Sequence, residues 1–357
     1  MAVLYLHIPA PPAPVASDRF VASLERAIGH RVPPAHAADP IIAIYIGGAP
    51  LTLTSPQQER LSRALKEALA PDTVQEVTVE AAPNSISLPV VRNLRRLGAT
   101  RLSLDVRSFA TDTLRRIDAP HRRPDIDQAL HAVRAAGLRS YTVDLHLGPD
   151  AAAETDVAAS LQAAVTESVP HIALVEQPGP ASAEARADAL AHAQQYLARQ
   201  GYEPYLLTDF ARPGHRSRYQ TAYYSHANIL GLGPGAESFW WQPRTGATPG
   251  WRWTNVAEVE QYIRSWEAGR PAFDQREPLD RTARAREYIL LRLRTQSGLD
   301  LSHLATQYGV DLRSRAANLF ARLSDTGRVE QTDGHLRLTR QGRLLADAIT
   351  QRVLRSL

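Results

Sequence analysis

Short apolar runs alternate with helical patterns through the first 208 residues, and this alternation limits the fold more than any other feature of the sequence. Near-continuous apolar runs are typical of parallel strands that are buried on both faces. The runs of strand length are residues 3–8, 41–46, 74–80, 100–105, 141–147, 171–176 and 204–208. Six or seven strand–helix units predict an α/β protein with a full or partial (β/α) barrel of the TIM type. In such barrels functional residues lie at the C-terminal ends of the strands.

Helix boundaries are marked by capping residues between these runs. Ser55 followed by Pro56 predicts a helix start, with Ser55 as the N-cap and Pro56 at the first helical position. Gly98, Gly137 and Gly201 each follow a helical pattern and are expected to end those helices in the left-handed conformation.

A chain of 357 residues exceeds the roughly 250–300 residues at which one hydrophobic core stops growing. We therefore expect a barrel over residues 1–208, a connector over 209–280 and a separate unit over 281–357. The connector is rich in glycine and aromatic residues and is expected to form loops that pack the two ends together. Three helical patterns and a hairpin turning at Asp333-Gly334 predict a small winged-helix-like domain at the C-terminal end.

The composition excludes several classes of protein. The chain contains no cysteine, which excludes disulfides, thiolate nucleophiles and cysteine-ligated metals. No run approaches the roughly 18 apolar residues that are needed to cross a bilayer. The first residues lack a basic segment and fit a strand better than a signal peptide, so we expect a cytoplasmic protein.

The charge is concentrated at the C-terminal end. Residues 281–357 contain 14 Arg and 7 acidic residues, a net charge of +7 within a chain whose total is +4. A basic domain of this kind is consistent with a nucleic-acid surface. More often such a charge reflects solvated helical faces in an arginine-rich protein, and Lys66, the only lysine of the chain, indicates that bias. Nucleic-acid binding is therefore the minor alternative.

The first strand ends in Tyr5-Leu6-His7-Ile8-Pro9 and leads into a Pro/Ala-rich loop, after which a helix is expected near Ser17. This frame resembles the first loop of the radical S-adenosylmethionine (SAM) proteins of the coproporphyrinogen dehydrogenase and heme-chaperone group. In that group three cysteines hold a four-iron cluster, and the corresponding places here are Pro11, Val15 and Asp18. Proline and valine cannot ligate iron, and one carboxylate is a hard donor mismatched to the cluster. We therefore expect no 4Fe–4S cluster.

The resemblance extends to the strand ends that contact SAM in this family. The residues kept at those places are Tyr5, Gly47, Gly48, Glu80 and Asp144. The residues changed are Ala49, Pro50, Arg107 and Ala119. Taken alone, the glycine pair is also typical of a turn, and Glu80 of a structural hydrogen bond. So many changes imply that SAM binding is weak here and that radical chemistry is lost.

Two of the departures lie two residues apart in the fourth strand. Asp105 and Arg107 replace a Gly and a Gln of the family segment, and in a strand they lie on one face. We expect the two side chains to neutralise each other across the vacated site.

Residues 209–239 resemble the heme-chaperone branch of the family most closely, in Asp209-Phe210-Ala211 and in Gly231-Leu232-Gly233-Pro234-Gly235. The two histidine places of that branch hold Tyr219 and Glu237 here. Tyrosine can ligate ferric heme, so a tyrosine is a candidate substitute. The candidate heme-binding residues are Tyr219, Tyr223, His215 and His226. The alternative is that these aromatic residues only pack an interdomain loop.

These observations together predict a cluster-free, non-catalytic relative of the heme chaperones. Its expected role is the binding or trafficking of heme or a related tetrapyrrole, or the regulation of a true family member, with another protein of heme metabolism as partner. Two alternatives stay open. One is a residual SAM-binding oxidoreductase of the coproporphyrinogen dehydrogenase type, and the other is a nucleic-acid-binding module formed by the basic C-terminal domain.

Overall fold

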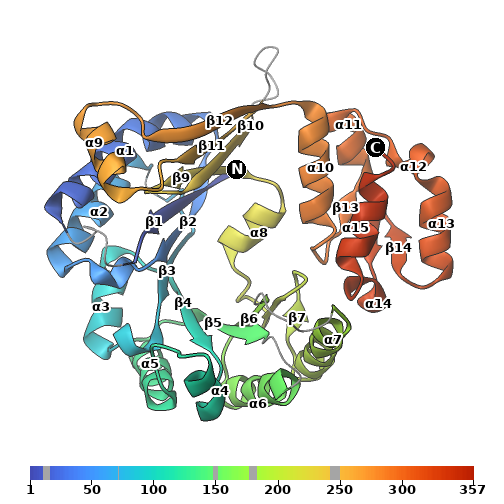
Figure 1. Ribbon diagram of the computed structural model, residues 1–357, viewed down its shortest axis with the longest axis horizontal. Coiled ribbons are helices and arrows are strands. Elements are labelled where there is room, and N and C mark those ends of the chain that lie inside the picture. Colours follow the sequence, from blue (N-terminus) through green and yellow to red (C-terminus); the bar gives the residue numbers. More distant parts are fainter. Residues whose placement is uncertain (11–16, 71, 148–151, 177–182, 242–249) are drawn as a thin grey trace.

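The computed structural model describes residues 1–10, 17–70, 72–147, 152–176, 183–241 and 250–357. Six parallel strands form the centre of its main sheet: β1 (Ala2–Ile8), β2 (Ile41–Gly48), β3 (Glu76–Ala81), β4 (Arg101–Arg107), β5 (Ser140–Leu147) and β6 (His171–Glu176). The helices between them are α1 (Asp18–Ala38), α2 (Ser55–Ala68), α3 (Leu88–Leu97), α4 (Thr111–Arg116), α5 (Arg123–Ala135), α6 (Ala152–Thr166) and α7 (Ala183–Arg199). Figure 1 shows the sheet as an open arc with these helices on its outer side. The predicted partial α/β barrel is confirmed.

The alternation of side chains along the strands explains this layering. Leu4, Leu6 and Ile8 of β1 are buried and pack outward against Phe20 and Leu24 of α1. The intervening side chains point into the arc, because neighbouring residues of a strand face opposite sides of the sheet. Among the described residues, no helix combines the length and the apolar character that a membrane span requires.

Helix boundaries follow the capping residues, with one correction. Ser17 caps α1 as expected, and its hydroxyl accepts the Phe20 backbone N–H at 3.2 Å. The N-cap of α2 is Thr54 rather than Ser55, since the Thr54 N–H donates to the Gln57 side chain at 3.0 Å. Gly98 caps α3 in the left-handed conformation, as predicted.

The seventh strand that was predicted over residues 204–208 is wrong. The chain instead makes β7 (Glu203–Pro204) and β8 (Asp209–Ala211), and β8 runs antiparallel to β6. A proline has no N–H to give to a sheet, so Pro204 stands on the edge strand and the chain turns back after it. The parallel part of the described barrel therefore ends at β6.

The glycine- and aromatic-rich connector was expected to form loops, but much of it forms strands of the same sheet. They are β9 (Asn228–Leu232), β10 (Glu237–Trp241), β11 (Gly250–Asn255) and β12 (Phe273–Leu279). β9 pairs in parallel with β1, and β10 to β12 continue antiparallel. Gly231 permits this pairing, because a Cβ there would lie 2.1 Å from the Glu237 carbonyl oxygen. The glycines therefore serve close strand approach rather than loop flexibility.

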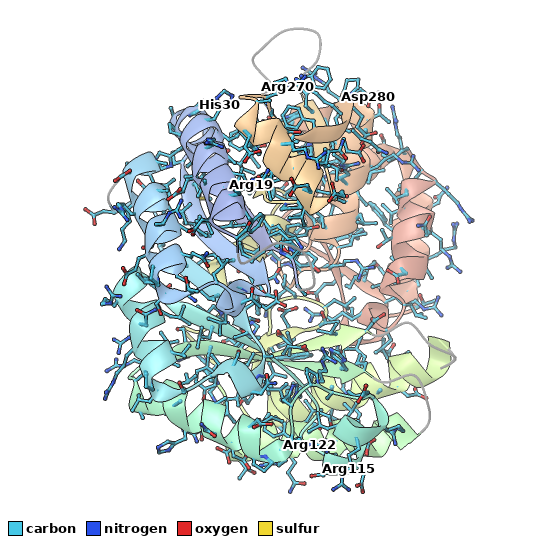
Figure 2. The ribbon with its side chains drawn as sticks, turned by 60° about the vertical axis from the view of Figure 1, so that its left-hand side comes forward. Arg19, His30, Arg115, Arg122, Arg270 and Asp280 are labelled. Carbon is cyan, nitrogen blue, oxygen red and sulfur yellow. The ribbon has the colours of Figure 1, made fainter. Side chains whose placement is uncertain are left out.

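A helix of the connector, α9 (Val259–Glu267), packs against α1. Arg19 of α1 joins the two helices, since its guanidinium bonds Glu267 at 2.8 Å and Glu260 at 3.1 Å. Figure 2 shows Arg19 at the boundary between α1 and α9. The connector is thus fastened to the outer side of the barrel as well as to its sheet.

The C-terminal part combines helices with a small sheet. The helices are α10 (Arg281–Arg292), α11 (Leu301–Tyr308), α12 (Leu312–Arg315), α13 (Ala317–Asp325), α14 (Arg340–Arg343) and α15 (Ala346–Leu354). The strands are β13 (Leu299–Asp300), β14 (Val329–Thr332) and β15 (His335–Leu338). Asp333 and Gly334 both have positive φ at the turn between β14 and β15, as a tight hairpin requires. The predicted winged-helix-like composition of this part is confirmed.

Candidate functional site

A short helix inside the arc positions the candidate tyrosines. This helix is α8 (Arg218–Tyr224), and Figure 1 shows it between the sheet and the C-terminal part. The buried carboxylate of Glu76 accepts hydrogen bonds from the Ser217 hydroxyl at 2.9 Å and from the backbone N–H groups of Arg218 and Tyr219 at 3.1 Å. A carboxylate at a helix N-terminus stabilises the helix and fixes its direction. Glu76 was not singled out in the sequence, because its partner lies more than 140 residues away.

The structure places Tyr5, Tyr219 and Tyr223 around one cavity of about 690 Å³, which we call the tyrosine cavity. It lies between the end of β1, helix α8, strand β10 and helix α10, and Glu237 and Arg252 also line it. Its volume falls within the roughly 300–1,000 Å³ range of small-molecule sites. The sequence prediction had grouped Tyr219 and Tyr223 but had assigned Tyr5 to a different site.

The two candidate tyrosines of α8, Tyr219 and Tyr223, differ in what surrounds their phenols. Tyr219 is 8% exposed and packs on Tyr45, with 5.2 Å between ring centroids. Burial raises its pKa, and the neighbouring phenols of Tyr223 and Tyr5 raise it further. Burial and Glu237 also raise the pKa of Tyr223, but Arg252 opposes that rise. Among the described residues, neither phenol has a hydrogen-bond partner.

His226 lines the same cavity, but both of its ring nitrogens are engaged. Nδ1 lies 3.2 Å from the Tyr308 hydroxyl, and Nε2 pairs with the guanidinium of Arg284. Burial, with Arg284 beside it, lowers the pKa of His226 to about 2, so the imidazole is neutral. A neutral imidazole with both nitrogens occupied has no free lone pair for a metal. Its geometry is that of a structural link between the connector and α10.

Arg284 completes this link and was missed in the sequence. Its guanidinium carbon lies 3.3 Å from the ring centroid of Phe239, and its Nη1 is 3.1 Å from a Glu287 carboxylate oxygen. Burial lowers the pKa of Arg284 to about 9. The sequence gives no local signal for this cluster, because Arg284 and His226 are 58 residues apart.

His215 lies apart from the tyrosine cavity. Its carbonyl oxygen accepts a hydrogen bond from Arg101 at 3.1 Å, and burial together with that guanidinium lowers the pKa of its ring. The candidate heme group of the sequence prediction is therefore divided. Tyr219, Tyr223 and His226 line the tyrosine cavity, whereas His215 lies beside Arg101 at the N-terminal end of β4.

Four of the five residues that were predicted as a vestigial SAM site, Tyr5, Gly47, Gly48 and Glu80, lie together near the C-terminal ends of β1 to β3. One oxygen of Glu80 accepts the Gly48 N–H at 3.2 Å and the Tyr45 hydroxyl at 3.5 Å. A Cβ at Gly47 would lie 2.8 Å from the Tyr5 ring, so the glycine makes room for that ring. Burial raises the pKa of Glu80. The Glu80 carboxylate and the Tyr5 ring are thus in contact with other residues of the protein.

Asp144 lies on β5, two strands from β3 in the sheet, and lines one cavity with Tyr45. Its carboxyl accepts the Ser103 hydroxyl at 2.9 Å, and burial raises its pKa to about 8. A second buried acid, Asp209, was not predicted as a site residue, and burial raises its pKa to about 6. Two carboxyl groups with raised pKa inside one barrel indicate that the interior favours their neutral forms.

Asp105 and Arg107 form the ion pair that was predicted, with 2.8 Å between Arg107 Nη2 and an Asp105 oxygen. His146 joins them, with its Nε2 at 3.5 Å from the second oxygen. Burial opposes ionisation of Asp105, but His146 and Arg107 hold its pKa below the usual value. Arg107 has a φ of 63° next to an irregularity in the β4–β5 pairing. The charge of the Arg107 guanidinium is therefore balanced by Asp105.

The places of the three cluster cysteines do not offer a matching donor set. Pro11 and Val15 lie outside the described residues, and neither side chain has a donor atom. Asp18 begins α1 with its carboxylate 80% exposed, and this group accepts hydrogen bonds from Gln57 at 3.2 Å and Arg60 at 3.3 Å. A four-iron cluster requires thiolates, and the sequence contains no cysteine. These residues do not fit the cluster.

Comparisons with known proteins agree with this architecture. Residues 279–345 match the family model of the HemN C-terminal domain. The heme chaperone HemW of Mycobacterium tuberculosis is 30% identical over 338 residues, which cover 89% of this chain and 82% of that protein. HemW of Bacillus subtilis is 24% identical over 351 residues, which cover 93% and 90%. The solved structure of Escherichia coli coproporphyrinogen III oxidase (HemN) has a TM-score of 0.80 at 22% identity, covering 100% of this chain and 90% of that one.

Proposed function

This chain belongs to the HemW heme chaperone family, on the radical SAM HemN/HemW branch, and from that membership we propose that it binds heme or a related tetrapyrrole in the tyrosine cavity. It would then pass this cargo to another protein of heme metabolism. The observation that carries the proposal is the phenol of Tyr223, which faces the cavity without a hydrogen-bond partner among the described residues. A phenolate is an established axial ligand of ferric heme.

Tyr223 is the preferred ligand on electrostatic grounds. Iron binds the deprotonated phenol, and Arg252 is the group that lowers the pKa of Tyr223 against burial. Tyr219 has only phenols among its pKa-shifting neighbours, and its ring is packed on Tyr45. Apolar side chains such as Ile229, Phe239, Leu290 and Leu291 provide walls suited to a porphyrin face.

We further propose that this binding involves no radical chemistry. Without three thiolates the chain cannot hold the cluster from which SAM receives an electron. We call the C-terminal ends of β2 to β4, with Gly48, Glu80, Asp105 and Arg107, the barrel mouth. There Arg107 forms an ion pair with Asp105, and Glu80 accepts hydrogen bonds from Gly48 and Tyr45. The protein would act by stoichiometric binding and release.

The test is a titration of ferric heme into the purified protein, followed in the Soret band. Tyr223→Phe removes the ligand atom, and we expect at least about a 100-fold loss of affinity, since even outer-shell partners contribute about 10–100-fold to metal sites. Tyr224→Phe is the matched control, because Tyr224 is the next residue of the same helix and does not line the cavity. Affinity should also rise with pH, because ligation releases the phenol proton.

Three outcomes would overturn the assignment. Equal loss of affinity in both variants would mean that α8 responds as a whole and that Tyr223 is not the ligand. Saturable one-to-one binding that survives Tyr223→Phe would move the heme site elsewhere. Weak, non-saturating spectra from the parent protein would remove heme binding and leave regulation of a true family member as the role to test.

A further inference from the structure

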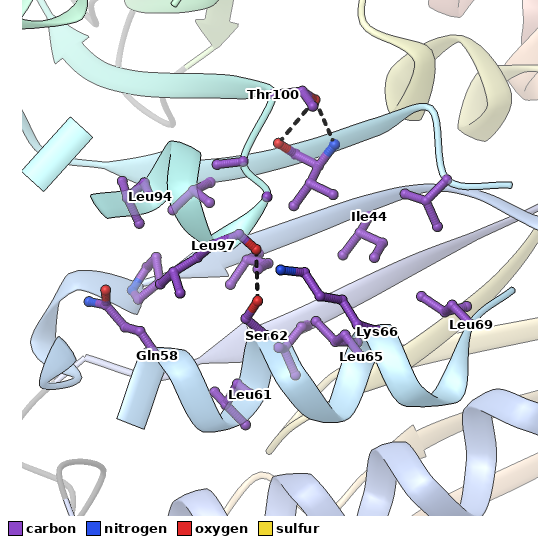
Figure 3. Close-up of a pocket in the computed structure, with 18 of the residues that line it drawn as sticks. Ile44, Gln58, Leu61, Ser62, Leu65, Lys66, Leu69, Leu94, Leu97 and Thr100 are labelled. Carbon is purple, nitrogen blue, oxygen red and sulfur yellow. Dashed lines mark hydrogen bonds between the residues drawn. The ribbon is translucent and has the colours of Figure 1, made fainter. Parts of the chain in front are cut away.

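A second cavity lies on the outer side of the barrel, on the opposite face of the strands from the tyrosine cavity. It has a volume of about 370 Å³ and lies between the sheet and helices α2 and α3 (Figure 3). We call it the outer cavity, and its apolar walls include Ile44, Ile46, Leu61, Leu65, Val77 and Val79. Ile44 and Ile46 alternate with Tyr45, which faces the barrel interior, so the two cavities are separated by the sheet itself.

The cavity has an apolar floor and opens to solvent at its rim, where Lys66, Asp72 and Thr100 are exposed. Apolar surface left in contact with water costs free energy in proportion to its area. Water does not fill an apolar void well, whereas such voids accept apolar ligands. A cavity of this volume lies within the range of small-molecule sites. An apolar occupant would therefore stabilise this part of the barrel.

The polar groups on the wall are mostly satisfied by the protein. The Ser62 hydroxyl donates to the Leu97 carbonyl oxygen at 2.7 Å, as the dashed line in Figure 3 shows. The Thr100 hydroxyl accepts the Val77 N–H at 2.9 Å. The Gln58 side chain donates to the Leu53 carbonyl oxygen at 2.9 Å. These groups hold the two helices and the sheet together and are already used.

Lys66 is the exception, and it is the single lysine of the chain. Within the described part of the chain, its ammonium has neither an ion pair nor a hydrogen bond. Its Cε lies 3.8 Å from the position that a Cβ on Gly98 would take, so the side chain reaches across the end of α3. Figure 3 shows it extending from α2 toward Leu97. Asp72 also lines the cavity, but it is exposed and forms no ion pair with Lys66.

We propose that the outer cavity binds an aliphatic monocarboxylate, with its chain among the apolar walls and its carboxylate on Lys66. One unpartnered cation above an apolar chamber matches a ligand with one anionic group and a saturated body. The single charge excludes a heme, whose two propionates would find only one cation. This site is independent of the tyrosine cavity and of the proposed heme role.

The test is equilibrium binding of dodecanoate to the purified full chain, with dodecanol as the uncharged analogue. We expect saturable one-to-one binding of dodecanoate, and about a tenfold loss in Lys66→Gln, which removes one charge-assisted hydrogen bond. Arg63→Gln is the matched control, because Arg63 is a cation of the same helix that is exposed, as Lys66 is, but does not line the cavity. Dodecanol should bind the parent and Lys66→Gln equally well.

Filling the cavity tests its location. Ala99→Leu adds apolar volume to the wall without removing a core side chain, and it should abolish binding of both ligands while leaving heme titrations unchanged. Leu65→Phe serves the same purpose if Ala99→Leu fails to fold. Binding that is unchanged in a folded filling variant, or weakened equally by Arg63→Gln, would overturn the proposal. So would the absence of saturable dodecanoate binding to the parent, which would mean that the cavity closes in solution.

Discussion

The barrel mouth and the tyrosine cavity both border Tyr5, but their polar groups are engaged differently. At the mouth, Glu80 accepts hydrogen bonds from Gly48 and Tyr45, and Asp105 is paired with Arg107. In the tyrosine cavity, the phenol of Tyr223 is left without a partner among the described residues. The polar groups of the barrel mouth are therefore bonded to other protein groups, whereas the tyrosine cavity contains a phenol that a ligand can bind.

This difference separates the retention of a residue from the availability of its polar atoms to a ligand. Glu80 and Asp144 are retained at places that contact SAM in the related family, yet their present partners are protein groups. The phenol of Tyr223, in contrast, lines a cavity and is not hydrogen-bonded to any described residue. A site is therefore better judged by the unused bonding capacity of its atoms than by residue identity alone.

The largest effect is expected from removing the carboxylate of Glu76, which holds helix α8 and thereby the tyrosine cavity in place. Glu76→Gln takes away the negative charge that faces Arg101 at 4.0 Å and the N-terminus of α8. We expect a loss of about 3–5 kcal/mol in the free energy of unfolding, as for other buried pairs that lose one partner. Heme affinity should fall as well, because α8 carries Tyr223. Denaturant titration and Soret titration measure the two effects.

Glu67→Gln is the control for this variant, since Glu67 is exposed on α2 and its loss should leave both measurements unchanged. If Glu76→Gln kept full stability, the position of Tyr223 would not depend on the buried carboxylate, and our account of α8 would be wrong.

The next prediction concerns the pH dependence of the free energy of unfolding, which the buried carboxyl of Asp144 should influence. The pKa of Asp144 is about 8 in the folded chain, whereas an unfolded aspartate has about 3.9. The folded state therefore holds a proton that the unfolded state releases, so the free energy of unfolding falls as pH rises from about 4 to 8. Asp144→Asn should flatten that slope and be more stable than the parent at pH 8 by at least about 2 kcal/mol.

Thermal melts across this pH window would measure the slope. Asp325→Asn changes an exposed aspartate of α13 and should leave the slope as it is in the parent. A parent whose stability rises steadily from pH 4 to 8 would show that Asp144 ionises normally.

Local signals predicted the first half of the fold well, for a physical reason. Continuous apolar runs gave strands β1, β2 and β6 nearly to their ends, and Gly98 marked the end of α3. Parallel strands buried on both faces need such runs, so the pattern is present in the local sequence. The antiparallel strands β10 to β12 lack that pattern, since β12 is exposed along most of its length and β10 and β11 are rich in tryptophan. Strand β8 is only three residues long.

The candidate site was predicted in part. Tyr219 and Tyr223 lie four residues apart, so one helix places both on the same side. The partners that decide their chemistry come from far away in the chain, as with Arg252 beside Tyr223. His226 was a reasonable ligand candidate by residue type, but its pairing with Arg284 depends on the packing of α10 against β10. No local pattern encodes that contact.

A smaller effect is expected from the ion pair at the mouth. Asp105→Ala, Arg107→Ala and the double variant form a cycle, and we expect a coupling of about 1 kcal/mol, since both side chains are partly exposed. The coupling should be present at neutral pH and disappear as the pH falls through the lowered pKa of Asp105. A coupling near zero at pH 7 would mean that the guanidinium is free to meet a ligand.

The smallest expected effect is the binding of SAM. It tests directly whether the polar groups of the barrel mouth are available to a ligand, as the phenol of Tyr223 is in the tyrosine cavity. Glu80 and Arg107 are the charged groups at the SAM-contact places of β3 and β4, and both are engaged by protein partners. We therefore expect a Kd no tighter than about 1 mM, equivalent to about 4 kcal/mol of binding. Calorimetric titration of the parent and of Glu80→Gln would measure it. A micromolar Kd that is lost in Glu80→Gln would show that the mouth still opens for SAM, because only a ligand that displaces the Gly48 and Tyr45 contacts could depend so strongly on that carboxylate.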